Sequence, residues 1–148
     1  MIFILIVIGI FILDLKIKNY IEENKEMHTK EEILGGNIIL NRYHNKGAFL
    51  NIFENNPKFI KTLSCVLLGL VTLVFAIVVP KGNKGWVKLG ISLILGGAAS
   101  NTHDRIKRGY VVDYFSFKFI KKIIFNISDI CIFIGSAILL ISGIISGK

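Results

Sequence analysis

Two aspartates that flank hydrophobic segments are the side chains of this sequence best suited to chemistry. Only three carboxylates follow Glu54 in the chain, and they are Asp104, Asp113 and Asp129. Asp113 comes directly after a short apolar run, and Asp129 lies within the last apolar segment. Because an ionisable group beside or inside a membrane span is costly, a functional role is the expected explanation for such acids.

Asp113 and Asp129 are expected to lie near the same boundary of the membrane. Two carboxylates brought together in a low-dielectric site cannot both ionise easily, so one pKa rises and a proton is shared. Such a pair can supply a general base that activates water and a general acid that protonates a leaving amine, which is the chemistry of aspartic peptidases. An alternative fits the spacing equally well, namely that each acid pairs with Lys or Arg to hold the fold together.

Other polar residues recur four apart, a spacing that places both side chains on one face of a helix. Arg105 is suited to neutralise or orient a carboxylate, and Asn101 on the same face can hydrogen-bond backbone or substrate. Asp104 meets an arginine at this spacing and is expected to be structural. For Asp14 and Lys18, a mutual ion pair explains the two residues at least as well as a direct catalytic role.

No metal or cofactor is predicted. The three histidines, His28, His44 and His103, are scattered without the spacing of metal ligands. No serine lies in a nucleophile-elbow pattern, and the sequence contains no glycine-rich phosphate loop. The paired carboxylates are therefore the candidate chemistry.

The composition predicts a membrane protein with a single domain, residues 1–148. The chain has 148 residues, of which 53% are hydrophobic, and its mean hydropathy is +0.64. The apolar residues form long runs, as is typical of a polytopic membrane protein. A net charge of +8 would suggest nucleic acid as a partner of a soluble protein. Here the basic residues flank the apolar runs, so membrane lipids and not nucleic acid are the expected partners.

Four membrane-spanning helices are expected, approximately at residues 2–20, 59–79, 86–103 and 123–145. The loop between the second and third spans contains Lys81, Lys84 and Lys88 and no acid, which favours the cytoplasmic side. Both termini are then cytoplasmic, and the active site is expected near the outer face.

The polar segment 21–58 is expected outside the cytoplasm. Its residues 33–43 contain a Gly-Gly-Asn turn and β-branched residues, a pattern that predicts short strands. Phe49, Ile52 and Phe53 follow at helical spacing and predict a short amphipathic helix on the membrane surface.

Five short boxes follow one another along the chain, namely Asp14–Lys18, Asn45–Phe49, Gly96–Arg105, Tyr110–Tyr114 and Phe125–Asp129. In this order they resemble the boxes of the lipoprotein signal peptidases of bacteria, also called signal peptidase II. Each box alone is weak, but five in the right order across four hydrophobic segments are a strong indication. Within them, Ser100 and Ser128 stand where the family has a usual glycine and a common alanine.

The resemblance implies an all-α membrane fold, a four-transmembrane-helix bundle with a small extracytoplasmic β-cradle and a short interfacial helix. It implies an aspartic endopeptidase of the bacterial cytoplasmic (inner) membrane, acting without metal or cofactor. Its substrates would be lipidated precursor proteins (prolipoproteins), cleaved just before a diacylglyceryl-modified cysteine. The chain is expected to be monomeric.

The resemblance also implies roles for individual residues. Asp113 and Asp129 would be the catalytic dyad. The residues that would line or support the site are Asn45, Gly47, Asn101, Arg105 and Asn126, and the structural residues would be Asp14, Lys18 and Asp104. Two other classes remain open: a non-catalytic adaptor or inactive paralogue in which the acids are structural, and a proton-coupled transporter. The transporter class has less support, because four spans without a repeat do not suggest alternating access.

Overall fold

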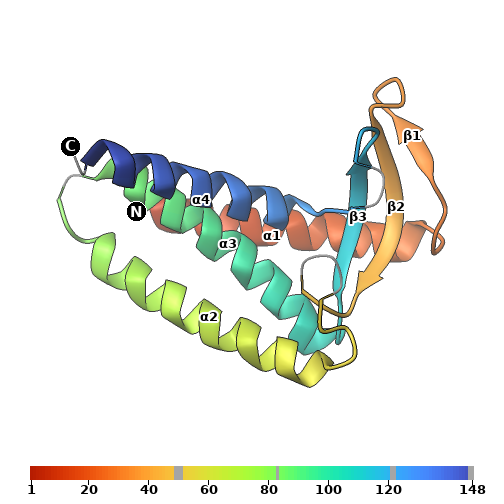
Figure 1. Ribbon diagram of the computed structural model, residues 1–148, viewed down its shortest axis with the longest axis horizontal. Helices are drawn as coiled ribbons and strands as arrows, with labels where there is room; N and C mark the ends of the chain where they lie inside the picture. Colours follow the sequence, from red (N-terminus) through yellow and green to blue (C-terminus); the bar gives the residue numbers. More distant parts are fainter. Residues whose placement is uncertain (49–51, 83, 121–122, 147–148) are drawn as a thin grey trace.

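The computed structural model describes residues 1–48, 52–82, 84–120 and 123–146. These residues form four helices and one three-stranded antiparallel sheet of order β1-β2-β3 (Figure 1). The elements are α1 (Ile2–Asn24), β1 (Glu31–Ile33), β2 (Ile38–Asn45), α2 (Pro57–Val78), α3 (Gly85–Lys107), β3 (Val111–Phe117) and α4 (Ile127–Ser146). The four helices run along the long axis, the sheet stands at one end, and both termini lie at the other end (Figure 1).

Helices occur in the four regions where spans are predicted, although several boundaries differ. The first and third helices continue to Asn24 and Lys107, beyond the predicted ends at residues 20 and 103. The fourth begins at Ile127 rather than at residue 123, because residues before it are extended and Phe125 exchanges backbone hydrogen bonds with Phe115.

Two of the helices are long and apolar enough to cross a membrane by length and composition. They are Pro57–Val78 and Ile127–Ile145, with mean hydropathies of 2.3 and 2.2. In α1 and α3 the polar residues lower the hydropathy, and many of these point into the bundle. Asp14 and Lys18 of α1, for example, are both fully buried.

The predicted strands at residues 33–43 are confirmed as parts of β1 and β2, with the turn at the glycines between them. The sequence analysis does not predict β3, which it treats as the end of the third-span region. The surface helix expected around Phe49, Ile52 and Phe53 lies partly outside the described residues. Its described part, residues 52–55, forms turns.

A register shift between Leu40 and Tyr43 divides the pairing of β2 with β3. Beyond this shift Tyr43 pairs with Asp113, and Asn45 pairs with Val111. Since residues two apart on one strand face the same side of a sheet, Asn45 and Asp113 are diagonal neighbours on one face. The sheet therefore brings the end of β2 to the first predicted catalytic acid.

Close packing of α3 against α4 sets the position of the second acid. A Cβ atom added to Gly97 would lie 2.5 Å from the carbonyl oxygen of Ser128, so only glycine allows this approach. Ser128 directly precedes Asp129. At the other side of the site, a small core of Ile21, Val112 and Tyr114 fastens β3 to the end of α1.

Candidate active site

Asp113 and Asp129 line the same pocket, which has a volume of about 240 Å³. Its polar wall is formed by these two acids together with Asn45, Asn101 and Arg105, while isoleucine and phenylalanine side chains of residues 123–133 form an apolar wall. The structure thus places the two acids, which lie on different elements of the chain, in one pocket, as the sequence predicts.

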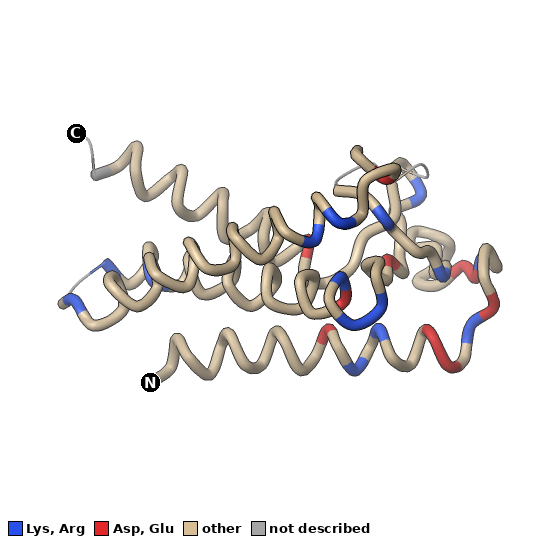
Figure 2. The backbone as a smooth tube through the Cα atoms, turned by 90° about the horizontal axis from the view of Figure 1, so that it is seen from below, with Lys and Arg blue, Asp and Glu red and all other residues tan. Residues whose placement is uncertain are grey.

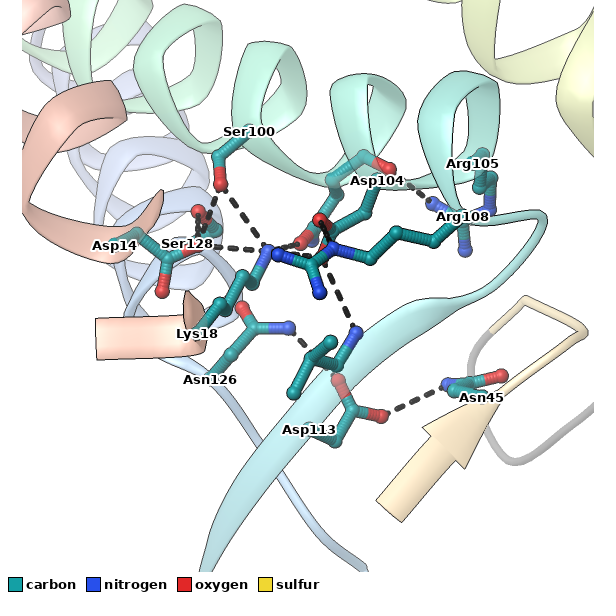
Figure 3. Close-up of polar contacts among 12 residues, drawn as sticks. Asp14, Lys18, Asn45, Ser100, Asp104, Arg105, Arg108, Asp113, Asn126 and Ser128 are labelled. Atoms are coloured by element: carbon teal, nitrogen blue, oxygen red, sulfur yellow. Dashed lines mark hydrogen bonds and ion pairs between the residues drawn. The ribbon is translucent and has the colours of Figure 1, made fainter. Parts of the chain in front are cut away.

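Asp113 is held by two asparagine amides. Its Oδ2 accepts a hydrogen bond of 3.0 Å from Nδ2 of Asn45, and its Oδ1 accepts one of 2.8 Å from Nδ2 of Asn126 (Figure 3 draws both residues). Only 3% of the residue is exposed. Burial, and next the negative charge of Asp129, raise the pKa of Asp113 to about 7, against the two hydrogen bonds that lower it. Asp113 can therefore hold or release a proton near neutral pH.

Asp129 lies in the first turn of α4. It forms a reciprocal capping box with Asn126. The Asn126 Oδ1 accepts from the backbone N–H of Asp129 at 2.9 Å, and the Asp129 Oδ2 accepts from the backbone N–H of Asn126 at 3.1 Å. The remaining amide group of Asn126 is the one that reaches Asp113. One buried asparagine therefore orients both acids.

Asn101 connects the second acid to a buried lysine. Its Nδ2 donates to Oδ1 of Asp129 at 2.9 Å, and its Oδ1 accepts from Nζ of Lys18 at 2.8 Å. The ammonium group fixes which end of the amide is the acceptor, so the donor end must face Asp129. This contact places Asn101 directly against the acid pair.

Arg105 lines the pocket but holds a loop. Its Nη2 donates to the carbonyl oxygen of Gly47 at 2.9 Å, and its Nη1 lies 3.4 Å from the carbonyl oxygen of Asn101. Within the described part of the chain it forms no salt bridge with a carboxylate, and its Nε is buried without a partner. Gly47 also donates its N–H to Oδ1 of Asn45 at 3.0 Å, which fixes the amide that contacts Asp113.

The predicted ion pairs of Asp14 with Lys18 and of Asp104 with Arg108 are both confirmed, and they join in one buried cluster (Figure 3). Nζ of Lys18 lies 2.8 Å from Oδ2 of Asp14 and 3.2 Å from Oδ2 of Asp104, and all three side chains are fully buried. Arg108 Nε lies 2.9 Å from Oδ1 of Asp104, on the rim. Two acids and two bases balance, as buried charges require.

Asp14 gathers hydroxyl groups from three elements that carry site residues. Its Oδ1 accepts from Tyr114 at 2.9 Å, and its Oδ2 accepts from Ser100 at 2.7 Å and from Ser128 at 2.5 Å. Tyr114 follows Asp113, Ser128 precedes Asp129, and Ser100 precedes Asn101. Burial and the adjacent Asp14 carboxylate raise the pKa of Tyr114, so its hydroxyl remains a donor.

The sequence analysis misses these three hydroxyl groups as parts of the site. Residue spacing gives no signal for them, because each reaches Asp14 from a distant part of the chain. A weak signal exists for the two serines, since both depart from the family pattern within two of the boxes. Ser100 and Ser128 are each fully buried, so both hydroxyls need the partner that Asp14 provides.

Comparisons with known proteins bear on the family and the fold of the chain. The family model described as signal peptidase (SPase) II matches residues 6–145. The lipoprotein signal peptidase of Lactococcus lactis subsp. lactis is 35% identical over 139 residues, covering 94% of this chain and 90% of that protein. That of Clostridioides difficile is 32% identical, with 95% and 93% covered. A solved bacterial membrane enzyme superposes with a TM-score of 0.88 at 26% identity, covering 99% of this chain and 89% of that one.

Proposed function

Since the chain belongs to the signal peptidase II family, we propose that Asp113 and Asp129 are the two catalytic carboxylates of this enzyme. Membership makes the protein a bacterial membrane endopeptidase that removes the signal peptide from prolipoproteins. The observation that carries the proposal is the shared pocket: both carboxylates line it, and each accepts two hydrogen bonds that fix its orientation.

The pair can perform hydrolysis as an acid and a base. The ionised carboxylate removes a proton from water while the water oxygen attacks the carbonyl carbon of the scissile peptide bond. The protonated carboxyl donates to the carbonyl oxygen, which gives a diol intermediate. As the C–N bond breaks, the leaving amine takes a proton from the carboxyl that was protonated by water, and one diol hydroxyl returns its proton to the other carboxylate, which restores the pair. A pKa of about 7 for Asp113 leaves both protonation states accessible near neutral pH, which this exchange of roles requires.

The supporting residues keep the two carboxylates at a fixed separation. Asn126 contacts both acids, while Asn45 and Asn101 each hold one of them. Arg105 and Gly47 secure the loop that follows Asn45 at the end of β2. The buried cluster of Asp14, Lys18 and Asp104 joins α1, α3 and β3 behind the pocket, so we assign it a structural role.

The substrate would reach the pocket sideways from the bilayer, with cleavage just before the lipidated cysteine. The apolar wall formed by residues such as Ile123, Ile132 and Phe133 supports this route.

In the proposed membrane orientation all four helices cross the membrane, both termini are cytoplasmic and the pocket lies near the outer face. The two lysines of the α2–α3 connection, and Lys88 at the start of α3, lie at the end opposite the sheet, which agrees with that orientation (Figure 2). A cysteine introduced at Gly82, in a chain without its native cysteines, should be labelled only in opened cells; labelling of intact cells would reverse the orientation.

Complementation tests the proposed function in cells. The wild-type chain should restore prolipoprotein processing in a bacterium that lacks its own enzyme, whereas Asp113→Asn and Asp129→Asn should accumulate in the membrane but leave precursors unprocessed. Glu54→Gln, an exposed acid outside the site, is the matched control and should restore processing. If the chain were a non-catalytic adaptor, the wild type would fail to restore processing, and the two Asn variants would not accumulate as folded protein.

The mass of the protein in detergent, measured by light scattering, tests the expectation that the chain is monomeric.

A further inference from the structure

At the end of the bundle opposite the sheet, the start of α3 and the end of α4 enclose an apolar groove. Two hollows of about 250 and 690 Å³ adjoin there, and both are lined by Trp86, Ser142 and Ile145. Ile138 and Ile141 line the smaller one, so the groove extends along about two turns of α4. None of its lining residues belongs to the candidate active site.

The mouth of the groove is purely basic. Lys84 lines the larger hollow, and Lys81 and Lys88 flank it along the chain. The sequence has no Asp or Glu between Glu54 and Asp104, and Figure 2 draws the lysines at this end without an acid near them. Within the described residues Lys81 and Lys84 have no carboxylate partner, so a bound anion can supply their countercharge.

The lysines are not equivalent. Lys88 is used internally, because its ammonium donates to the carbonyl oxygen of Lys81 and lies 5.8 Å from the ring centre of Phe3. Lys81 and Lys84 are exposed and form no salt bridge within the described ranges. Lys84 has a φ of 63°, in the left-handed region that residues with a side chain rarely adopt. The residue with this rare backbone conformation is the one that brings a cation to the groove.

We propose that this groove binds an anionic phospholipid of the membrane face opposite the active site. The phosphate would lie against Lys81 and Lys84, and an acyl chain would follow the groove past Trp86. The Ile127–Ile145 part of α4 is apolar enough to cross a bilayer, so the groove has access to acyl chains. A free phosphate ion could match the lysines but would leave the apolar wall uncovered. Trp86 is 69% exposed and has the amphipathic side chain favoured at this depth.

The only tryptophan of the chain is Trp86, so its fluorescence reports on this groove alone. The full chain is reconstituted in phosphatidylcholine bilayers that contain a fixed fraction of tail-brominated phosphatidylglycerol or tail-brominated phosphatidylcholine. The two quenchers differ only in their headgroup. An exposed lysine near an anionic headgroup contributes about 1 kcal/mol, which is roughly fivefold in local enrichment. Brominated phosphatidylglycerol should accordingly quench Trp86 several-fold more effectively than brominated phosphatidylcholine at the same fraction.

Variants and competitors decide the interpretation. Lys84→Gln, and further Lys81→Gln with Lys84→Gln, should reduce the preference stepwise, whereas Lys107→Gln at the other end of α3 should preserve it. Inorganic phosphate added to the buffer should not displace the quencher. Equal quenching by the two brominated lipids in the wild type, a preference that survives the double Gln variant, or full displacement by inorganic phosphate would each overturn the proposal.

Discussion

Replacing Asn126 by serine separates the two interactions of this buried side chain. Its Oδ1 accepts from the Asp129 N–H at 2.9 Å as the cap of α4, and its Nδ2 donates to Asp113 at 2.8 Å. Serine caps helices about as well as asparagine. Its shorter side chain, however, has no amide group to reach Asp113. The Asn126→Ser variant should thus keep the helix start and lose the donor to one acid.

The expected size follows from the charge of the acceptor. A hydrogen bond to a charged group contributes about 1.5–3 kcal/mol, equivalent to roughly 10- to 150-fold in kcat if it is lost entirely in the transition state. Burial raises the pKa of Asp113 and the Asn126 amide opposes that rise, so losing the amide should move the alkaline limb of the pH–rate profile to higher pH. Asn126→Ala should also lose the cap, which costs about 1 kcal/mol more of unfolding free energy.

Cleavage of a purified lipidated precursor in detergent gives kcat and KM, and a thermal melt gives stability. The matched control is Asn56→Ser at the start of α2, where Oδ1 of an N-cap asparagine accepts from the Phe59 N–H at 3.2 Å and the side chain does not line the pocket. That variant should retain wild-type kcat. The reasoning is refuted if Asn126→Ser shows wild-type kcat with an unshifted pH profile, or if it is destabilised as much as Asn126→Ala.

Three further predictions follow from the same contacts. Tyr114→Phe and Ser128→Ala each remove a hydroxyl that donates to Asp14. Each should lower kcat by roughly tenfold, if about 1.4 kcal/mol is lost, with little change in KM. Ser92→Ala removes a buried hydroxyl that donates to a helix carbonyl, and this control should keep the wild-type kcat. The pKa of Asp113 is raised to about 7 in the folded state, so this residue favours the folded state at low pH and loses that contribution as the pH rises from about 4 to 7. Melting temperatures should therefore fall over this window less steeply in Asp113→Asn than in the wild type. Parallel slopes would contradict the assignment. Lys18→Met leaves two buried carboxylates without their ammonium partner and should destabilise the protein by about 3–5 kcal/mol, measured as a lower midpoint in a thermal melt.

How far the sequence predicts the site depends on how local each contact is. The pairs Asp14–Lys18 and Asp104–Arg108 follow from helical spacing alone and are present in the structure. The dyad follows from the ordered boxes, and the shared pocket supports it, while its catalytic role stays a prediction. The contacts of Asp14 with Ser100 and Ser128 span 86 and 114 residues, so they depend on the packing of α1, α3 and α4. No local pattern encodes such a contact.

The third strand is missed for a related reason. The run Val111-Val112 before Asp113 is apolar because β3 is buried on both sides, and such a run resembles the end of a membrane span. Only its pairing with β2, three elements earlier in the chain, distinguishes the two possibilities. The loop contact of Arg105 is non-local in the same way, since its partner Gly47 lies 58 residues away.

The central claim, that Asp113 and Asp129 act as one catalytic unit, is tested most directly by the kinetics of the two single Asn variants and their double combination on a lipidated precursor. General acid–base catalysis predicts that each single variant loses on the order of 100- to 10,000-fold in kcat while remaining folded. Residues that act together lose their contribution once, so the double variant should be no slower than the slower single variant. Near-wild-type cleavage by either single variant, or losses that multiply in the double variant, would contradict the account.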